Sequence, residues 1–247
     1  MKQKVENQKE NIKPNNKAIK ELEDQEEETG PSKLEEFVKQ NRNIILIVSG
    51  ILILAIAAFF YIRSTMESSS LEASVALSRI APYVEKQQFE IALKGDPSLK
   101  VRGQSVIGLL AIIDKYGSTK QGKVAALYAA DCYMGMNQPE EAKKYFDQAT
   151  DSESELIQAG ANAGMGVYYE HKGNLKESAK YYEKAAELSG ETDARERYLY
   201  YAALCYENSG SKDKAIAIYK DIILTKEYSE FSGLAKTGLA RLGTIIE

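Results

Sequence analysis

The sequence predicts an all-α fold in which one N-terminal transmembrane helix precedes an α-solenoid of paired helices. Two observations predict it. Residues 44–62 form an apolar run without a single charged side chain. From residue 122 onward, small and aromatic residues recur at intervals of 36 or 37 residues, and a period of this size is typical of stacked helix pairs.

The apolar run has the length of a membrane span. At 1.5 Å per residue it measures about 28 Å, close to the ~30 Å hydrocarbon thickness of a bilayer. Ser49 and Gly50 interrupt its hydrophobicity, and spanning helices tolerate both. A buried core helix is the alternative, although it would usually be shorter and carry a polar stripe. A signal peptide is disfavoured because the run is long and begins far from Met1.

The segments before the span are a tail and a helix start. Residues 1–31 are dense in charge and contain almost nothing to bury, which predicts a disordered cytoplasmic tail. We interpret its acidic run as solvated; contact with a basic surface is the alternative. Ser32 and Glu35 fit a capping box, so residues 32–63 are predicted to form a juxtamembrane helix that continues directly into the span.

Flanking cations predict the orientation of the span. Lys33, Lys39 and Arg42 precede it closely, whereas Arg63 is followed by no further cation until Arg79. The positive-inside rule therefore places the N-terminus in the cytoplasm and the C-terminal domain outside it.

Residues 64–121 are predicted to form a helical connector. Leu71, Leu77 and Ile80 continue the first helix at roughly helical spacing. Pro82 lacks an N–H and should break or kink this helix near Ala81, with a second helix over residues 82–92. Residues 94–97 read as a turn, and residues 105–116 as a short apolar helix closed by a glycine.

Residues 122–247 contain three aligned segments. A small residue opens the second helix of each segment, an aromatic follows four positions later, and a tyrosine ends each first helix. In chain order the small residues are Ala142, Ser178 and Ala215, the aromatics are Phe146, Tyr182 and Tyr219, and the tyrosines are Tyr133, Tyr169 and Tyr206. Small residues let paired helices approach closely, and the aromatics should fill the gap between one pair and the next.

These residues resemble the tetratricopeptide repeat, so the solenoid is expected to be tetratricopeptide-like. The residues of the second segment that match the repeat in order and spacing are Gly166, Tyr169, Ser178, Tyr182 and Ala185. The chain departs from the repeat in three ways. Its period is longer by two or three residues, and the bulky residue expected near the start of each first helix is replaced by Ala126, Asn162 and Leu199. In the third segment Ile222 replaces the alanine of the second helix. Residues 230–242 should form a capping helix, because an open solenoid end has to be covered.

The resemblance also implies a partner-binding groove lined by the first helix of each repeat. The residues expected to point into it are Val124, Leu127, Asp131, Met134, Gly160, Ala163, Val167, Glu170, Arg197, Tyr200, Leu204 and Glu207. Tyr and Arg often anchor protein interfaces, which favours Tyr200 and Arg197 as anchors. The alternative is that these residues form one solvated face of the solenoid.

The sequence offers little chemistry. It has no glycine-rich phosphate loop, serine elbow or metal-spaced cysteine and histidine cluster, so we expect no enzymatic activity, cofactor or metal. Its one histidine, His171, is interpreted as an exposed turn residue rather than a catalytic base.

Cys132 and Cys205 stand two repeats apart. Their Cα atoms should therefore be further apart than the ~7 Å limit for a disulfide. A net charge of −4 disfavours a nucleic-acid partner.

From residue 34 onward the chain resembles the YfgM-like ancillary subunits of the bacterial SecYEG translocon. The residues that carry this resemblance lie at 35–41, 92–96 and 113–120. The resemblance implies a single-pass protein of the bacterial inner membrane with a periplasmic C-terminal domain. It also implies, as partners, the SecYEG translocon and periplasmic chaperones such as a prolyl isomerase. A scaffold of another envelope complex, in cell division or outer-membrane assembly, is the alternative, and an enzyme is a third possibility.

Overall fold

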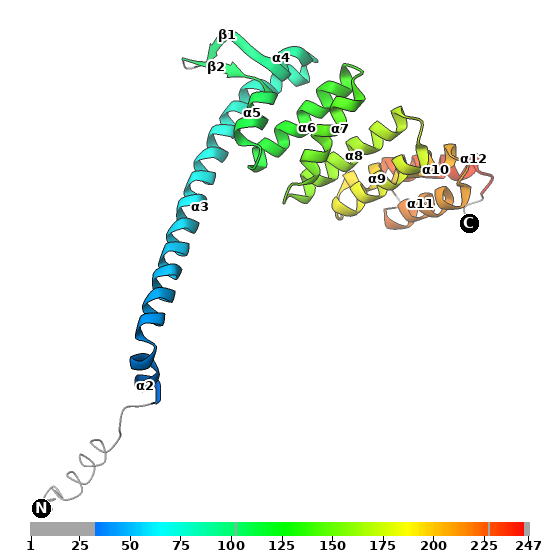
Figure 1. The fold of residues 1–247 in the computed structure, drawn as a ribbon. Coiled ribbons are helices and arrows are strands. Elements are labelled where there is room, and N and C mark those ends of the chain that lie inside the picture. Colours follow the sequence, from blue (N-terminus) through cyan, green and yellow to red (C-terminus); the bar gives the residue numbers. More distant parts are fainter. Residues whose placement is uncertain (1–32, 102, 227, 245–247) are drawn as a thin grey trace, which may run out of the picture. The chain divides into compact units, whose positions relative to one another are not determined.

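The structure is a computed structural model that describes residues 33–101, 103–226 and 228–244. The chain divides into two compact units, one ending at Ile62 and the other beginning at Arg63. The elements, coloured along the chain in Figure 1, are α2 (Lys33–Gln40), α3 (Arg42–Glu85), α4 (Phe89–Lys94), β1 (Gly95–Val101), β2 (Gln104–Ile107), α5 (Leu109–Tyr116), α6 (Lys120–Gly135), α7 (Pro139–Thr150), α8 (Glu155–His171), α9 (Leu175–Leu188), α10 (Asp193–Asn208), α11 (Lys212–Thr225) and α12 (Glu230–Arg241).

The first unit contains α2 and the start of α3. The predicted single helix is divided at Asn41, which forms a turn. Two backbone hydrogen bonds cross this turn, from Asn41 N to Phe37 O at 3.0 Å and from Ile45 N to Asn41 O at 2.9 Å. Ser32, the predicted capping residue, and the tail of residues 1–31 lie outside the described residues.

Helix α3 is long and apolar enough to cross a membrane. The large apolar side chains between Ile44 and Ile62 are all exposed in the isolated chain. A water-facing apolar surface of this size is unusual in a soluble protein, and it indicates contact with a bilayer or another chain.

Of the break or kink expected near Ala81, the break is wrong, because α3 continues through Pro82 to Glu85. The proline removes one N–H donor, but its own carbonyl accepts from Lys86 N at 3.1 Å. Ile80 is fully buried and Tyr83 packs against the same core, so packing holds the turn that contains the proline. The helix ends before Gln87, which has φ = 58°, and the predicted helix over 82–92 is replaced by the end of α3 and by α4.

The connector also contains a β-hairpin that the sequence analysis missed. β1 and β2 pair antiparallel, with Gly95 opposite Ile107 and an irregularity between Asp96 and Lys100. The residues expected to form a turn at 94–97 belong largely to β1, and the helix expected from residue 105 begins only at Leu109. Gly95 allows β1 to lie this close to β2. A Cβ at this position would lie 2.5 Å from the Val106 carbonyl oxygen, so a residue with a side chain would prevent the two strands from approaching.

The connector and the first repeat share one hydrophobic core. Its buried members come from α3, α4, β2, α5 and α6, and they are Ala73, Ile80, Ala92, Leu93, Val106, Leu109, Ile112, Tyr116, Ala125, Ala129 and Cys132. The hairpin and the end of α3 are therefore packed against the solenoid rather than joined to it by a bare linker.

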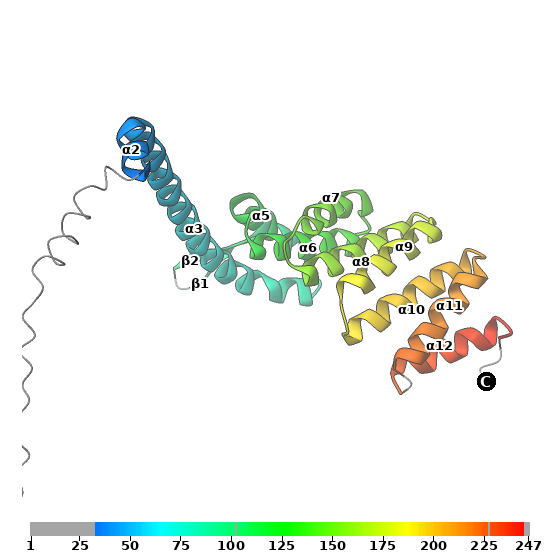
Figure 2. The ribbon, with the colours of Figure 1, turned by 90° about the horizontal axis from the view of Figure 1, so that it is seen from below.

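The solenoid has the predicted helix pairs. Each helix from α6 to α11 contacts the next one along the chain, and Figure 2 shows this succession along the second unit. The pairs are α6 with α7, α8 with α9, and α10 with α11, and α12 covers the last pair as the predicted cap. The N-terminus of α6 is capped by the Thr119 hydroxyl, which accepts from Gly122 N at 3.0 Å.

The aromatic of each second helix fills the gap that the sequence predicted. Phe146, Tyr182 and Tyr219 are all buried. A methyl group at Gly238 would lie 2.5 Å from the Tyr219 ring, and one at Gly164 would collide with the Phe146 ring. Phe146 therefore packs into a space left by a glycine of the following pair, and Tyr219 into one left by a glycine of α12. Tyr182 packs against Gly166 of its own pair, and its ring centroid lies 5.5 Å from that of Tyr201 on α10. The two cysteines, Cys132 and Cys205, are free and buried, as predicted.

Candidate functional site

The residues predicted to line a binding groove lie on α6, α8 and α10, and we call this set the first-helix face. Its ten core members are Leu127, Asp131, Met134, Ala163, Val167, Glu170, Arg197, Tyr200, Leu204 and Glu207. Four are exposed (Asp131, Val167, Glu170 and Arg197) and the other six are half-buried. Val124 and Gly160 are half-buried as well. Leu127 approaches α8 closely, because a methyl group at Gly160 would lie 3.0 Å from Leu127 Cδ2.

Glu170 is held by two internal donors. The Tyr182 hydroxyl donates to its Oε2 at 3.0 Å, and the Cys205 thiol donates to its Oε1 at 3.1 Å. Burial raises the pKa of Cys205 to about 12, and the carboxylate of Glu170 adds to this shift. The thiol is thus a protonated donor, and Glu170 joins α8 to α9 and α10.

Glu207 is held in a similar way at the end of the stack. It accepts from the Tyr219 hydroxyl at 2.7 Å, and it accepts from Arg241 Nε and Nη2 at 2.9 Å each. The bonds from Arg241 and from Tyr219 both lower the pKa of the Glu207 carboxyl. A carboxylate bound by a guanidinium through two nitrogens is strongly oriented, so Glu207 fastens α12 to α10 and α11.

Asp131 differs from these two acids. Within the described residues it has neither an ion pair nor a hydrogen bond to its carboxylate. Its side chain reaches water, yet the surrounding protein displaces enough hydration to raise its carboxyl pKa to about 6. Both observations fit a carboxylate recessed among neighbouring side chains and open on one side. At neutral pH it remains largely ionised.

The two predicted anchors have different environments. The Tyr200 ring lies 6.2 Å from the Tyr219 ring and 6.0 Å from the Phe231 ring, so much of it packs inside the solenoid. Arg197 is exposed, and its guanidinium lies 5.2 Å from the Tyr198 ring centroid. Arg197 is therefore the more accessible of the two. Contact between Tyr200 and the capping helix was not foreseen.

The apolar members of the first-helix face come from all three helices. Leu127 and Met134 lie on α6, Ala163 and Val167 on α8, and Leu204 on α10. Val167 is the most accessible of the large ones, with 42% of its surface exposed. The first-helix face thus combines apolar side chains with an acid that has no partner among the described residues, Asp131, and an exposed base, Arg197.

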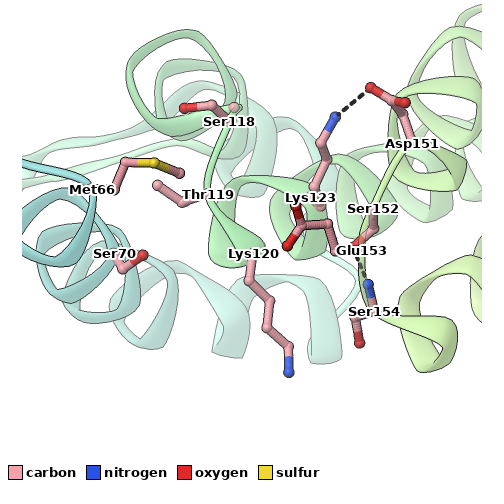
Figure 3. A pocket seen from close by; sticks show the side chains of 11 residues that line it. Met66, Ser70, Ser118, Thr119, Lys120, Lys123, Asp151, Ser152, Glu153 and Ser154 are labelled. Carbon is pink, nitrogen blue, oxygen red and sulfur yellow. Dashed lines mark hydrogen bonds and ion pairs between the residues drawn. The ribbon is translucent and has the colours of Figure 1, made fainter. Parts of the chain in front are cut away.

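A separate cavity of about 800 Å³ lies beside the start of α6. Figure 3 shows hydroxyl groups and lysines from three segments around it, with Lys123 paired to Asp151 at 3.4 Å. The residues that line it are Met66, Ser70, Gly117, Ser118, Thr119, Lys120, Lys123, Asp151, Ser152, Glu153 and Ser154. Met66 and Ser70 lie within α3, and the others come from turns and from the start of α6. No periodic pattern links these segments, so the sequence analysis missed the cavity.

His171 is exposed, as predicted, but it is the last residue of α8 rather than a turn residue. Over the part of the chain that the structure describes, no group of three or more histidine, cysteine or acidic side chains is arranged to hold a metal ion.

Helix pairs of this period, with small residues facing aromatics, define a tetratricopeptide-repeat solenoid. Two family models described as tetratricopeptide repeat match the chain, one over residues 129–194 and the other over residues 197–225. No curated protein matches the sequence. The chain therefore contains tetratricopeptide repeats, a class of module that is typically non-enzymatic and that binds other proteins.

Proposed function

We propose that this protein is a membrane-anchored, non-catalytic interaction module whose first-helix face binds a protein partner. The observation that supports this proposal is that one chain contains both a repeat stack and an exposed apolar helical segment. A repeat stack with an accessible mixed face follows a helical segment, residues 44–62, whose large apolar side chains are all exposed. The first feature suits a protein partner, and the second suits a bilayer.

The proposed topology follows from the flanking charges. Residues 1–31 form the cytoplasmic tail and residues 32–63 the juxtamembrane and transmembrane helix. Residues 64–121, the connector, and residues 122–247, the repeat domain, lie in the periplasm of a bacterium with the span in its inner membrane. The excess of Lys and Arg before the span supports this orientation. A reporter enzyme that is active only outside the cytoplasm, fused to the C-terminus, should be active; an inactive fusion that is stably produced would reverse the topology.

The proposed partner is the SecYEG translocon, which this protein would link to periplasmic chaperones such as a membrane-anchored prolyl isomerase. The resemblance of residues 35–41, 92–96 and 113–120 to YfgM-like subunits supports this partner. The alternative is a scaffold of another envelope complex, in cell division or outer-membrane assembly.

A pull-down of the full-length protein in mild detergent, followed by mass spectrometry, tests these partners. Channel subunits with a prolyl isomerase would support the translocon. A different envelope complex without channel subunits would support the alternative. Capture of nothing above background would contradict the interaction module itself.

A matched pair of variants tests the face. Val167→Glu places a charge on the exposed apolar part of the first-helix face. Leu156→Glu makes the same kind of change on the same helix, at a side chain that is 75% exposed and outside the face. Val167→Glu should reduce capture of the partner, and Leu156→Glu should leave it unchanged. Equal capture by both variants would rule out the first-helix face as the binding surface.

A further inference from the structure

We infer that the segment bound at the first repeat carries a lysine or arginine whose cationic group pairs with Asp131. The inference rests on the proposed function, because it names the chemistry of the partner that the first-helix face would take. It is drawn from the way the acids of the face are used within the fold.

Of the three acids on the face, two are occupied. Glu170 binds Tyr182 and Cys205, and Glu207 binds Tyr219 and Arg241. Asp131 has no such partner within the described residues, and its side chain is exposed. Among the described residues, Asp131 is thus the acid of this face whose carboxylate accepts no internal hydrogen bond, which leaves both of its oxygens available to a cation from outside.

Apolar side chains border Asp131 along its own helix. Leu127 precedes it by four residues and Met134 follows it by three, so all three share one face of α6. Both apolar side chains are half-buried and keep some surface in contact with water. An acid between two apolar surfaces suits lysine or arginine, because the alkyl stem can pack on those surfaces while the charged head pairs with the carboxylate.

The charge is particular to the first repeat. The positions equivalent to Asp131 in the next two repeats are Val167 and Leu204, 36 and 73 residues further on. Both are apolar, and Val167 is exposed. A segment lying along the face would therefore present a basic side chain to α6 and an apolar side chain to α8.

The electrostatics favour an external cation. A carboxylate that has lost hydration without gaining a partner is less stable in its ionised form, which is why the Asp131 pKa lies near 6. A bound ammonium or guanidinium would favour the ionised form. A neutral donor would favour the ionised form less strongly than a cation does, and an acidic side chain would disfavour it.

The experiment is a peptide selection on the full-length protein held in lipid nanodiscs. Random dodecapeptides displayed on phage are selected against the wild type, Asp131→Asn and Glu187→Gln. Asp131→Asn preserves shape and removes one negative charge. Glu187→Gln removes the same charge from an exposed side chain of α9, outside the face and without an ion pair among the described residues. Circular dichroism and thermal midpoints establish that all three proteins are folded.

Peptides enriched on the wild type and on Glu187→Gln should share a lysine or arginine beside an apolar residue. This preference should disappear on Asp131→Asn, and the best wild-type peptide should bind that variant at least about tenfold more weakly. Enrichment of peptides that lack a basic residue would contradict the inference, and so would an unchanged preference for lysine or arginine on Asp131→Asn. Either result would still be consistent with peptide binding by the first-helix face. If no peptide is enriched on the wild type, both the inference and peptide binding by the face are contradicted.

Discussion

The hydroxyl of Tyr182 donates a hydrogen bond to the carboxylate of Glu170 at 3.0 Å, twelve residues earlier in the chain. Tyr219 and Glu207 repeat this pair at the same interval and at 2.7 Å. In the first repeat the corresponding residues are Phe146 and Met134, which pack in one apolar cluster. A buried tyrosine hydroxyl requires a partner, so the acid is present where the aromatic has a hydroxyl and absent where it has none.

Exchanging this pair for its apolar counterpart should be better tolerated than exchanging one member. Glu170→Met alone leaves the buried Tyr182 hydroxyl without its acceptor, and we expect a loss of about 1–3 kcal/mol in the free energy of unfolding. Adding Tyr182→Phe should recover part of that loss, because the pair then matches the first repeat. Urea denaturation of the two single variants and the double variant measures the coupling. Purely additive losses would show that the two side chains do not depend on each other.

Two glycines within helices should respond to alanine in opposite ways. Gly164 on α8 lies against the Phe146 ring, so the methyl group of Gly164→Ala would force the ring or the helix to move. We expect a loss of about 1–3 kcal/mol, as for other overpacked sites. Gly233 on α12 has no neighbouring atom within 4 Å of an added Cβ. Gly233→Ala should stabilise by up to about 1 kcal/mol through helix propensity.

Thermal unfolding of the two alanine variants measures this contrast. A midpoint for Gly164→Ala at or above that of the wild type would show that α7 and α8 are not packed as closely as Phe146 requires.

The repeat was predictable because its signal is periodic. Ala142, Ser178 and Ala215 recur at one position, and an aromatic recurs four residues after each of them. These relations depend on spacing alone, so they could be seen before the structure. The capping helix followed from the same argument, since the last pair has an apolar face to cover.

The connector and the details of the face were less predictable because they depend on contacts distant in the sequence. The strand at Gly95 forms only because Val106 approaches it. Pro82 stays within a helix because Ile80 and Tyr83 are held by a core shared with α6. Tyr200 looked like a free anchor, but Phe231 of the cap packs against it. The sequence around Gly95, Pro82 and Tyr200 contains no pattern that predicts these distant contacts.

The contacts of Arg241 should fasten the capping helix in a pH-dependent manner. Its two hydrogen bonds to Glu207 are among the interactions that lower the pKa of that carboxyl in the folded protein. A lowered folded pKa gives stability above the unfolded value near 4.5, and this stability is lost as the pH falls through the folded pKa. Arg241→Ala should cost about 1–3 kcal/mol at pH 7, and the difference from the wild type should shrink below about pH 4.

Urea unfolding at the two pH values measures this effect. Lys236→Ala is a suitable control because Lys236 is exposed on the same helix, α12, and substitutions of this kind usually change stability by less than about 0.5 kcal/mol. A loss for Arg241→Ala that is the same at both pH values would show that the ion pair is not its cause.

The unpartnered Asp131 should give the opposite dependence on pH. Its folded pKa of about 6 is higher than the unfolded value near 3.9. The folded state therefore binds the proton of Asp131 more tightly than the unfolded state does. This proton binding contributes to the free energy of unfolding fully below about pH 4, and the contribution is lost as the pH rises through 6. Asp131→Asn removes this loss, so the variant should gain stability relative to the wild type between about pH 4 and pH 6. Glu187→Gln, measured in parallel, should change little across that range because its side chain is exposed. If the difference between Asp131→Asn and the wild type does not change with pH, the carboxylate of Asp131 is fully hydrated in the folded protein.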